Sequence, residues 1–311
     1  MRVIAQTGRE DIAMVYLAEK EPGRLIEFVE SVQFPFAREK KWVLTISTLY
    51  GCPVRCRFCD AGGYYQGKLS TDEMIFQIDY LVKKRFSSGK IPVEKFKIQF
   101  ARTGEPSFNQ NVLDVLERLP ELYDAPGLIP SLSTIAPQGT DGFFERLLEI
   151  KRKRYAQSFQ FQFSLHTTDE KLRDWLIPAR KWILEKMAEY GETFFQTGAK
   201  KITLNFALAE GMPVDPDILL RHFHPDRFLI KITPVNPTYQ ASQNKIFSHI
   251  LPGKEKYEII DALRQAGYEV ILSIGELAEN YIGSNCGQYV TTYKKAKASI
   301  EGGYTFDLQK L

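Results

Sequence analysis

Short runs of alternating hydrophobic and polar residues open the chain. Residues 13–17, 25–29 and 31–34 have the composition and spacing of strands, and Pro22-Gly23 predicts a turn between the first two. From Trp42 onward the pattern changes to strand, loop and helix. We therefore predict a small N-terminal β extension over residues 1–40, packed on a larger α/β unit that covers residues 41–311.

Strand-like and helix-like segments alternate within the larger unit. The expected strands cover residues 42–47, 95–100, 129–134, 159–165, 201–206 and 228–232, and the expected helices cover 71–82, 112–119, 143–155 and 183–198. Ser70 or Thr71 is suited to cap the first helix. This alternation predicts an α/β fold with a parallel sheet, and a chain of 311 residues is long enough for one barrel.

The overall composition is typical of a soluble globular protein. Hydrophobic residues make up 44% of the chain, charged residues 25%, and the formal net charge is +3. A charge of this size neither requires nor excludes a polyanionic partner. The N-terminus lacks a signal-peptide pattern, and no stretch approaches the ~18 apolar residues of a membrane span. We expect a cytoplasmic protein with no membrane partner.

Three of the four cysteines, Cys52, Cys56 and Cys59, lie within eight residues. A four-iron, four-sulfur (4Fe-4S) cluster normally binds four cysteines, so three thiolates leave one iron open for an external ligand. Open coordination positions are typical of catalytic metals, whereas a structural zinc needs four protein ligands. A disulfide would leave an odd thiol, and Cys286 is more than two hundred residues away. The triplet favours an iron–sulfur cluster, with zinc or free thiols as alternatives.

The Cys-x3-Cys-x2-Cys spacing, with Phe58 before the last cysteine, resembles the motif of the radical S-adenosylmethionine (radical SAM) enzymes. The resemblance implies that the open iron binds S-adenosylmethionine (SAM). It further implies that an electron donor such as flavodoxin or ferredoxin drives cleavage of SAM to a 5'-deoxyadenosyl radical. It also implies a partial (β/α)6 barrel of the TIM type, with the active face on the loops after the strands. A non-catalytic iron–sulfur sensor is a less favoured alternative.

Further strings resemble the RlmN/Cfr family of ribosomal RNA adenine methyltransferases. They lie at residues 67–73, 164–166, 234–237 and 285–288, while Gly104-Glu105-Pro106 resembles the radical SAM segment that binds the amino group of the cofactor. A carboxylate such as Glu105 suits the ammonium group of SAM, although an isolated Gly-Glu-Pro is more often a turn. A lone histidine such as His166 is more often a packed or surface residue. By this resemblance, the residues expected to contact SAM are Gly104, Glu105, Ser133, Ser164, His166 and Asn236.

The same resemblance gives two candidates for catalysis. Cys286 matches the family cysteine that first receives a methyl group from SAM and then carries it to carbon 2 or 8 of an adenine. A thiolate is a strong nucleophile toward a sulfonium methyl group, while the alternative is a buried apolar cysteine. Glu30 matches a family glutamate proposed to assist proton removal.

Three departures separate the chain from the family. Thr45 occupies the position of the second cysteine, which resolves the protein–RNA adduct in the family. Family members carry an additional N-terminal RNA-binding domain, and their arginine-rich segment before Cys-Gly-Gln contains Glu276 and Glu279 here. Carboxylates repel phosphate. We therefore expect a radical SAM enzyme that transfers a methyl group through Cys286 to an unidentified, non-ribosomal substrate. An RNA adenine C-methyltransferase is the alternative.

Overall fold

The computed structural model describes residues 1–33, 36–251, 253–254, 256–275, 277–285, 289–291 and 303–311. Two residues singled out by sequence, Glu276 and Cys286, lie outside this described part. The strands are β1 (Arg2–Arg9), β2 (Ala13–Glu19), β3 (Leu25–Val32), β4 (Lys41–Ile46), β5 (Leu49–Gly51), β6 (Tyr65–Lys68), β7 (Lys95–Phe100), β8 (Leu128–Thr134), β9 (Gln160–Ser164), β10 (Ile202–Ala207), β11 (Phe228–Thr233), β12 (Val270–Leu272) and β13 (Gln309–Lys310).

The helices alternate with the strands from β7 to β12. The α-helices are α1 (Thr71–Arg85), α2 (Asn111–Leu122), α3 (Asp141–Ile150), α4 (Glu170–Leu176), α5 (Leu184–Phe194), α6 (Pro216–His222), α7 (Tyr239–Gln243), α8 (Glu258–Gln265) and α9 (Leu277–Ile282). Ser70 caps α1 as predicted, in a reciprocal pair of hydrogen bonds with Glu73. No helix in the described residues is long and apolar enough to cross a membrane.

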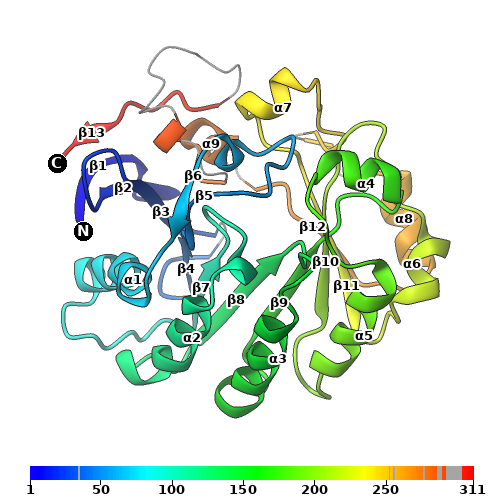
Figure 1. The fold of residues 1–311 in the computed structure, drawn as a ribbon, viewed down its shortest axis with the longest axis horizontal. Helices are drawn as coiled ribbons and strands as arrows, with labels where there is room; N and C mark the ends of the chain where they lie inside the picture. The colour runs from blue at the N-terminus through cyan, green and yellow to red at the C-terminus, as the bar shows by residue number, and fades with distance from the viewer. Residues whose placement is uncertain (34–35, 252, 255, 276, 286–288, 292–302) are drawn as a thin grey trace.

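One eleven-stranded sheet, in the order β12-β11-β10-β9-β8-β7-β4-β3-β2-β1-β13, organises the described residues. Strands β4 and β7 to β12 pair in parallel, and β3, β2, β1 and β13 continue the sheet in antiparallel pairs. Strands β5 and β6 form a separate antiparallel pair. The sheet is curved, with α1, α2, α3, α5 and α6 along one side (Figure 1). This confirms the predicted α/β partial barrel, with β12 as a seventh parallel strand that was not predicted.

The two faces of the parallel sheet differ in polarity. The face that packs on the helices is apolar, and its buried side chains belong to one core cluster: Trp42, Leu44, Ile46, Phe96, Ile98, Phe100, Phe161, Phe163, Leu204, Phe206, Ile230 and Ile232. The alternate residues point to the opposite face, which we call the inner face. Register pairs such as Ser133 with Gln162, and Asn205 with Lys231, show that polar side chains line this inner face.

The N-terminal extension shares the sheet with the barrel, because β3 pairs with β4. One side of β2 and β3 joins the main core beside α1. The other side packs against Ile282, Tyr289, Val290 and residues of the C-terminal segment 303–311. Both ends of the chain therefore meet on this part of the sheet, where β13 lies beside β1 (Figure 1).

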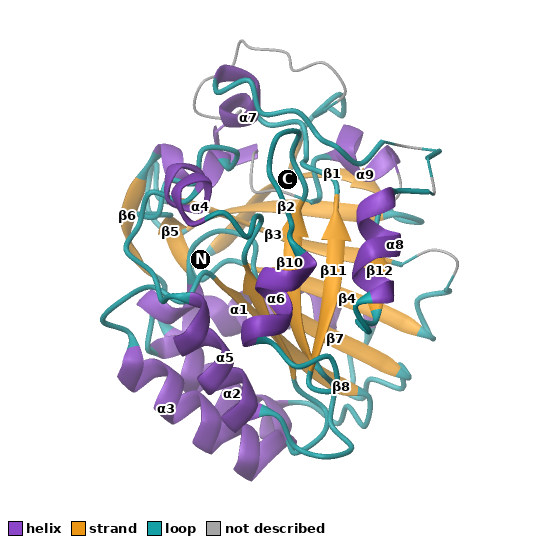
Figure 2. Ribbon diagram, turned by 90° about the vertical axis from the view of Figure 1, so that its right-hand side faces the viewer, coloured by secondary structure: helices purple, strands orange, loops and turns teal. Residues whose placement is uncertain are grey.

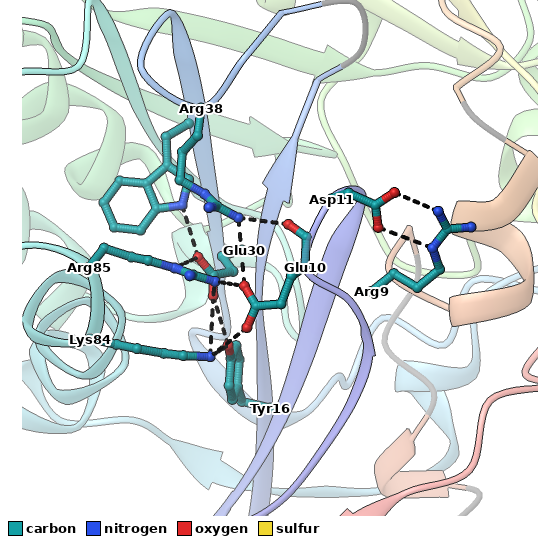
Figure 3. A network of polar contacts seen from close by, with 9 residues as sticks. Arg9, Glu10, Asp11, Tyr16, Glu30, Arg38, Lys84 and Arg85 are labelled. Carbon is teal, nitrogen blue, oxygen red and sulfur yellow. Dashed lines mark hydrogen bonds and ion pairs between the residues drawn. The ribbon is translucent and has the colours of Figure 1, made fainter.

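Glu30 lies on the helix-facing side of β3, at the centre of an ion-pair network (Figure 3). Its neighbour across the β3–β4 ladder is Leu44, a residue of the main core. The buried carboxylate accepts hydrogen bonds from Tyr16 at 2.7 Å, Trp42 at 3.1 Å and Arg85 at 2.8 and 3.0 Å. These contacts tie α1 to the extension, so the structure does not bring Glu30 together with the other predicted site residues.

We predict that Glu30→Gln destabilises the fold by about 3 kcal/mol, because it leaves Arg85 facing a neutral group in a largely buried pair. Glu10→Gln is the matched control: this carboxylate also pairs with Arg85 but is half exposed, so its loss should cost less than about 1 kcal/mol. Urea unfolding measures both. Equal costs for the two variants would contradict this structural role of Glu30.

Candidate active site

The three-cysteine loop follows β5 directly. Gly51 turns the chain with φ +81°, and a Cβ atom there would lie 1.7 Å from the carbonyl oxygen of Tyr64, so only glycine fits. Cys52 N–H then donates to the carbonyl of Ala61 at 2.8 Å, and Cys59 N–H donates to that of Cys56 at 3.0 Å. The loop is thus folded back on itself, with all three cysteines free and partly buried.

An apolar cluster separate from the main core surrounds this loop. Cys52, Cys56 and Phe58 pack against residues that follow different strands: Val54, Ile135, Leu176, Ile177, Ala209, Val235, Ala241 and Ile246. Because these residues come from the loops after β5, β8, β9, β10 and β11, the carboxyl ends of the parallel strands converge on the cysteines. Active sites of α/β barrels lie at this end.

Burial makes the free thiolates unfavourable. It raises the pKa of Cys52 to about 11, with a further contribution from the nearby charge of Glu105. Burial also raises the pKa of Cys56, although Lys181 acts in the opposite direction. Backbone hydrogen bonds from Val54 and Arg55 favour the Cys52 thiolate. Iron ions would offset the remaining cost, because a coordinating thiol is deprotonated by the metal charge.

The segment that follows β11 is tied to the cysteine loop. Thr238 donates to the carbonyl of Phe58 at 2.7 Å, and Asn244 donates to the carbonyl of Arg57 at 2.9 Å. Asp60 accepts hydrogen bonds from the first backbone amides of α7, at 3.0 and 2.8 Å. The structure thus shows the segment after β11 docked on the cysteine loop.

Glu105 is a buried carboxylate that is held by hydrogen-bond donors. It accepts from the Thr134 hydroxyl at 2.6 Å, the Ile135 amide at 2.9 Å, and Ser107 at 2.8 and 3.1 Å. Burial nevertheless raises its pKa. Within the described residues it forms no ion pair with lysine, arginine or histidine. The site therefore has a place for a positive charge close to Cys52.

His166 lies beside the cysteine loop in a strained conformation. Its φ is +68°, and its ring makes an edge contact with Phe58 at 5.0 Å between centroids. The Nδ1 atom accepts a hydrogen bond from the Ala207 amide at 2.9 Å, which leaves the proton on Nε2. Burial lowers the pKa of His166 to about 3, so the neutral ring can donate from Nε2 at physiological pH.

The remaining predicted cofactor residues lie at the same end of the sheet. Ser133 and Ser164 stand at the ends of β8 and β9, and Ser133 accepts a hydrogen bond from Gln162 at 3.1 Å. Asn236 follows β11. Gly104 has φ +106°, and a Cβ atom there would lie 2.6 Å from Leu49, so this loop packs tightly on β5. Among the predicted residues described, Glu30 alone is placed elsewhere.

The carboxyl ends of the parallel strands, with the loops that follow them, form a rim around the cysteines. A buried ion pair next to this rim was not predicted from the sequence. Arg102 Nε lies 3.0 Å from Glu27, and both side chains are almost fully buried. Arg102 also donates to the carbonyls of Gly283 and Ser284, while Glu27 accepts from the Val290 amide at 3.1 Å. The pair therefore holds the described residues on both sides of positions 286–288. Glu27, three residues before Glu30, faces the opposite side of β3.

The residues at the rim fit a cluster bound by three cysteines. No group of three or more His, Cys, Asp or Glu side chains in the described part of the chain is arranged to hold a metal ion. A 4Fe-4S cluster does not require its ligands to converge on one ion, because each cysteine binds a different iron. The free thiols, their apolar surroundings and the unpaired charge of Glu105 suit a cluster together with a cationic ligand.

Known proteins resemble the chain over most of its length, although no family model matches it. A probable dual-specificity RNA methyltransferase RlmN of Chlorobium phaeobacteroides is 28% identical, over 88% of this chain and 73% of that protein. The dual-specificity RNA methyltransferase RlmN of Wolinella succinogenes is 24% identical, over 92% and 83%. A solved radical SAM methyltransferase from Sphaerobacter thermophilus shares the fold, with a TM-score of 0.65 and 20% identity over 93% of this chain and 81% of that one.

These similarities support a protein of the radical SAM class, and hence an enzyme. More narrowly, the chain has an RlmN/Cfr-like radical SAM core. RNA is the substrate named for these relatives, and the similarity by itself does not assign a substrate to this chain.

We predict that replacing Cys52, Cys56 or Cys59 with Ala removes the iron and the brown colour of the anaerobically reconstituted protein, since three ligands are the minimum for an open cluster. Cys286→Ala is the control and should retain both. Iron and sulfide content, with the visible spectrum, measure the effect. Full cluster content in a variant of the triplet would contradict the assignment.

We predict that Arg102→Met costs about 3–5 kcal/mol, because it removes the buried countercharge that faces the Glu27 carboxylate. The double variant Arg102→Met/Glu27→Met removes both charges and should recover much of that loss. Both variants lose the bonds to Gly283 and Ser284, so hydrogen exchange at residues 283–285 and 289–291 should be faster in each. Unchanged exchange in the double variant would show that the pair does not hold these residues.

Proposed function

We propose that the protein is a radical SAM enzyme that transfers a methyl group through Cys286 to a non-ribosomal substrate. The observation that carries this proposal is the buried Glu105 carboxylate beside the three free thiols, which has four hydrogen-bond donors but no cationic partner among the residues that the structure describes. The ammonium group of SAM is the cation that RlmN/Cfr-like chemistry brings to such a rim. The ammonium group would lower the raised pKa of Glu105, and this stabilisation of the carboxylate would contribute to the binding of SAM.

Enzymes of this type use a 4Fe-4S cluster that donates an electron to bound SAM and generates a 5'-deoxyadenosyl radical. In this chain, Cys52, Cys56 and Cys59 hold the cluster. Glu105 and Gly104 orient the methionine end of SAM, and His166 Nε2, Ser133, Ser164 and Asn236 supply polar contacts from neighbouring strand ends. The apolar cluster around the cysteines excludes water, which protects a radical from side reactions.

Cys286 is proposed as the methyl carrier. Its thiolate attacks the methyl carbon of SAM, so that a new C–S bond forms as the methyl–sulfonium bond breaks, and S-adenosylhomocysteine leaves. The thiol proton passes to solvent or to a nearby base. The Arg102–Glu27 pair supports this role, because it fixes the flanking residues Ser284 and Val290 to the end of β7 that leads into Glu105.

The electron donor is proposed to be a small redox protein of the flavodoxin or ferredoxin type, in the cytoplasm. RNA is the alternative substrate, since the relatives are named RNA methyltransferases. Two features argue for a different substrate. Thr45 replaces the resolving cysteine, and Glu279 stands in a segment that is arginine-rich in the family.

We predict that mass spectrometry of protein expressed with an intact cluster finds one added methyl group on Cys286. Cys286→Ala should still cleave SAM to 5'-deoxyadenosine, because cleavage needs only the cluster rim, but should give no methylated product. Cys286→Ser keeps the size of the side chain and is the matched control for folding. An unmodified Cys286 under these conditions would limit the function to hydrogen abstraction.

A further inference from the structure

Lysines gather on the inner face of the partial barrel, below the rim that carries Glu105 and the cysteines. Lys97 comes from β7 and Lys231 from β11, and Lys41 opens β4. The register places Lys97 beside Val43, and Lys231 beside Asn205, on the face that the helices do not cover. Lys97 precedes the end of β7 by three residues, a rise of about 10 Å.

These lysines are held close to one another without matching carboxylates. Lys41, Lys97, Lys200 and Lys231 lie within electrostatic range, and burial together with the other three charges lowers the pKa of Lys97 to about 7. Burial also lowers the pKa of Lys231 and Lys41. None of the four forms an ion pair within the described residues, whereas their neighbour Lys201 pairs with Glu269 at 4.0 Å.

Among the residues that the structure describes, Glu279 of α9 is the carboxylate that acts on this cluster: its charge favours the protonated form of Lys231. The single negative charge of Glu279 does not balance the four lysines, so an excess of positive charge remains. The inner face beside Lys97 and Lys231 is polar, with the buried side chains of Ser131, Gln162, Thr203 and Asn205. Like charges held close together destabilise a fold, and such a cost is typical of a site that binds a ligand of opposite charge.

We propose that the inner face binds the phosphate group of a phosphate ester of about nucleotide size, with Lys97 and Lys231 as the contacting cations. The two lysines come from β7 and β11, four strands apart in the sheet, and their register places both on the inner face of this curved sheet. A ligand that contacts Lys97 and reaches the end of β7 must span about 10 Å, which requires a phosphate ester larger than phosphate itself. That this ligand is the substrate rests on the proposed function, whereas phosphate binding itself does not.

Isothermal titration of the full-length, cluster-containing protein with adenosine 5'-monophosphate and with adenosine tests the proposal. The monophosphate should bind at least about tenfold more tightly than adenosine, and Lys97→Gln or Lys231→Gln should each remove about that factor. Glu279→Gln should tighten binding, because it removes the negative charge that acts on Lys231. Lys83→Gln, at an exposed position of α1, is the matched control and should change nothing. Equal binding of the two ligands, or unchanged binding in both lysine variants, would overturn the proposal.

A stability measurement separates this role from a structural one. Lys97→Met should raise the melting temperature of the ligand-free protein, because it relieves burial and repulsion, and adenosine 5'-monophosphate should then stabilise the wild type but not the variant. A lower melting temperature in ligand-free Lys97→Met would assign Lys97 to the fold and contradict the proposal. Assays of SAM cleavage run in parallel: a protein that binds the monophosphate but leaves SAM intact would disprove only the proposed function.

Discussion

The burial of a carboxylate to which the described part of the chain supplies no cation is the constraint on which the site depends. Glu105 is held by donors from Ser107, Thr134 and Ile135, so its position is fixed before any ligand binds. Its charge also disfavours the Cys52 thiolate, whose pKa is already raised by burial. Iron and a cationic ligand would relieve both costs together. The rim is therefore better suited to the loaded state than to the empty one.

Strand alternation determines how the rest of the molecule supports this rim. Every second residue of the parallel strands enters the core beneath the helices, which leaves the inner face free for polar and charged groups. Figure 2 shows the strands running together toward one end, where α4 and α7 lie with the loops. The N-terminal strands and the C-terminal segment complete one side of this end, joined by the Arg102–Glu27 pair. The helix-facing side of the sheet thus holds the apolar core that stabilises the fold, and the inner face holds the polar and charged groups.

Much of this arrangement could be predicted from local patterns. Cys52, Cys56 and Cys59 carry a distinctive spacing, and the apolar alternation of segments such as 95–100 identifies the strands. Short elements such as β12 and α6 were missed, because three to seven residues contain too little periodicity to detect. Glu30 was a plausible match by sequence, but the side of the sheet that a residue faces depends on register with β4. Glu27, Arg102 and Asp60 carry no local signal, since their partners are distant in the chain.

The most direct test of the central claim is electron paramagnetic resonance of the anaerobically reconstituted and reduced protein, before and after addition of SAM. The account predicts the signal of a 4Fe-4S cluster, a change in that signal when SAM binds the open iron, and a weaker change in Glu105→Gln. A protein that takes up no iron, or a cluster signal that SAM leaves unaltered, would contradict it.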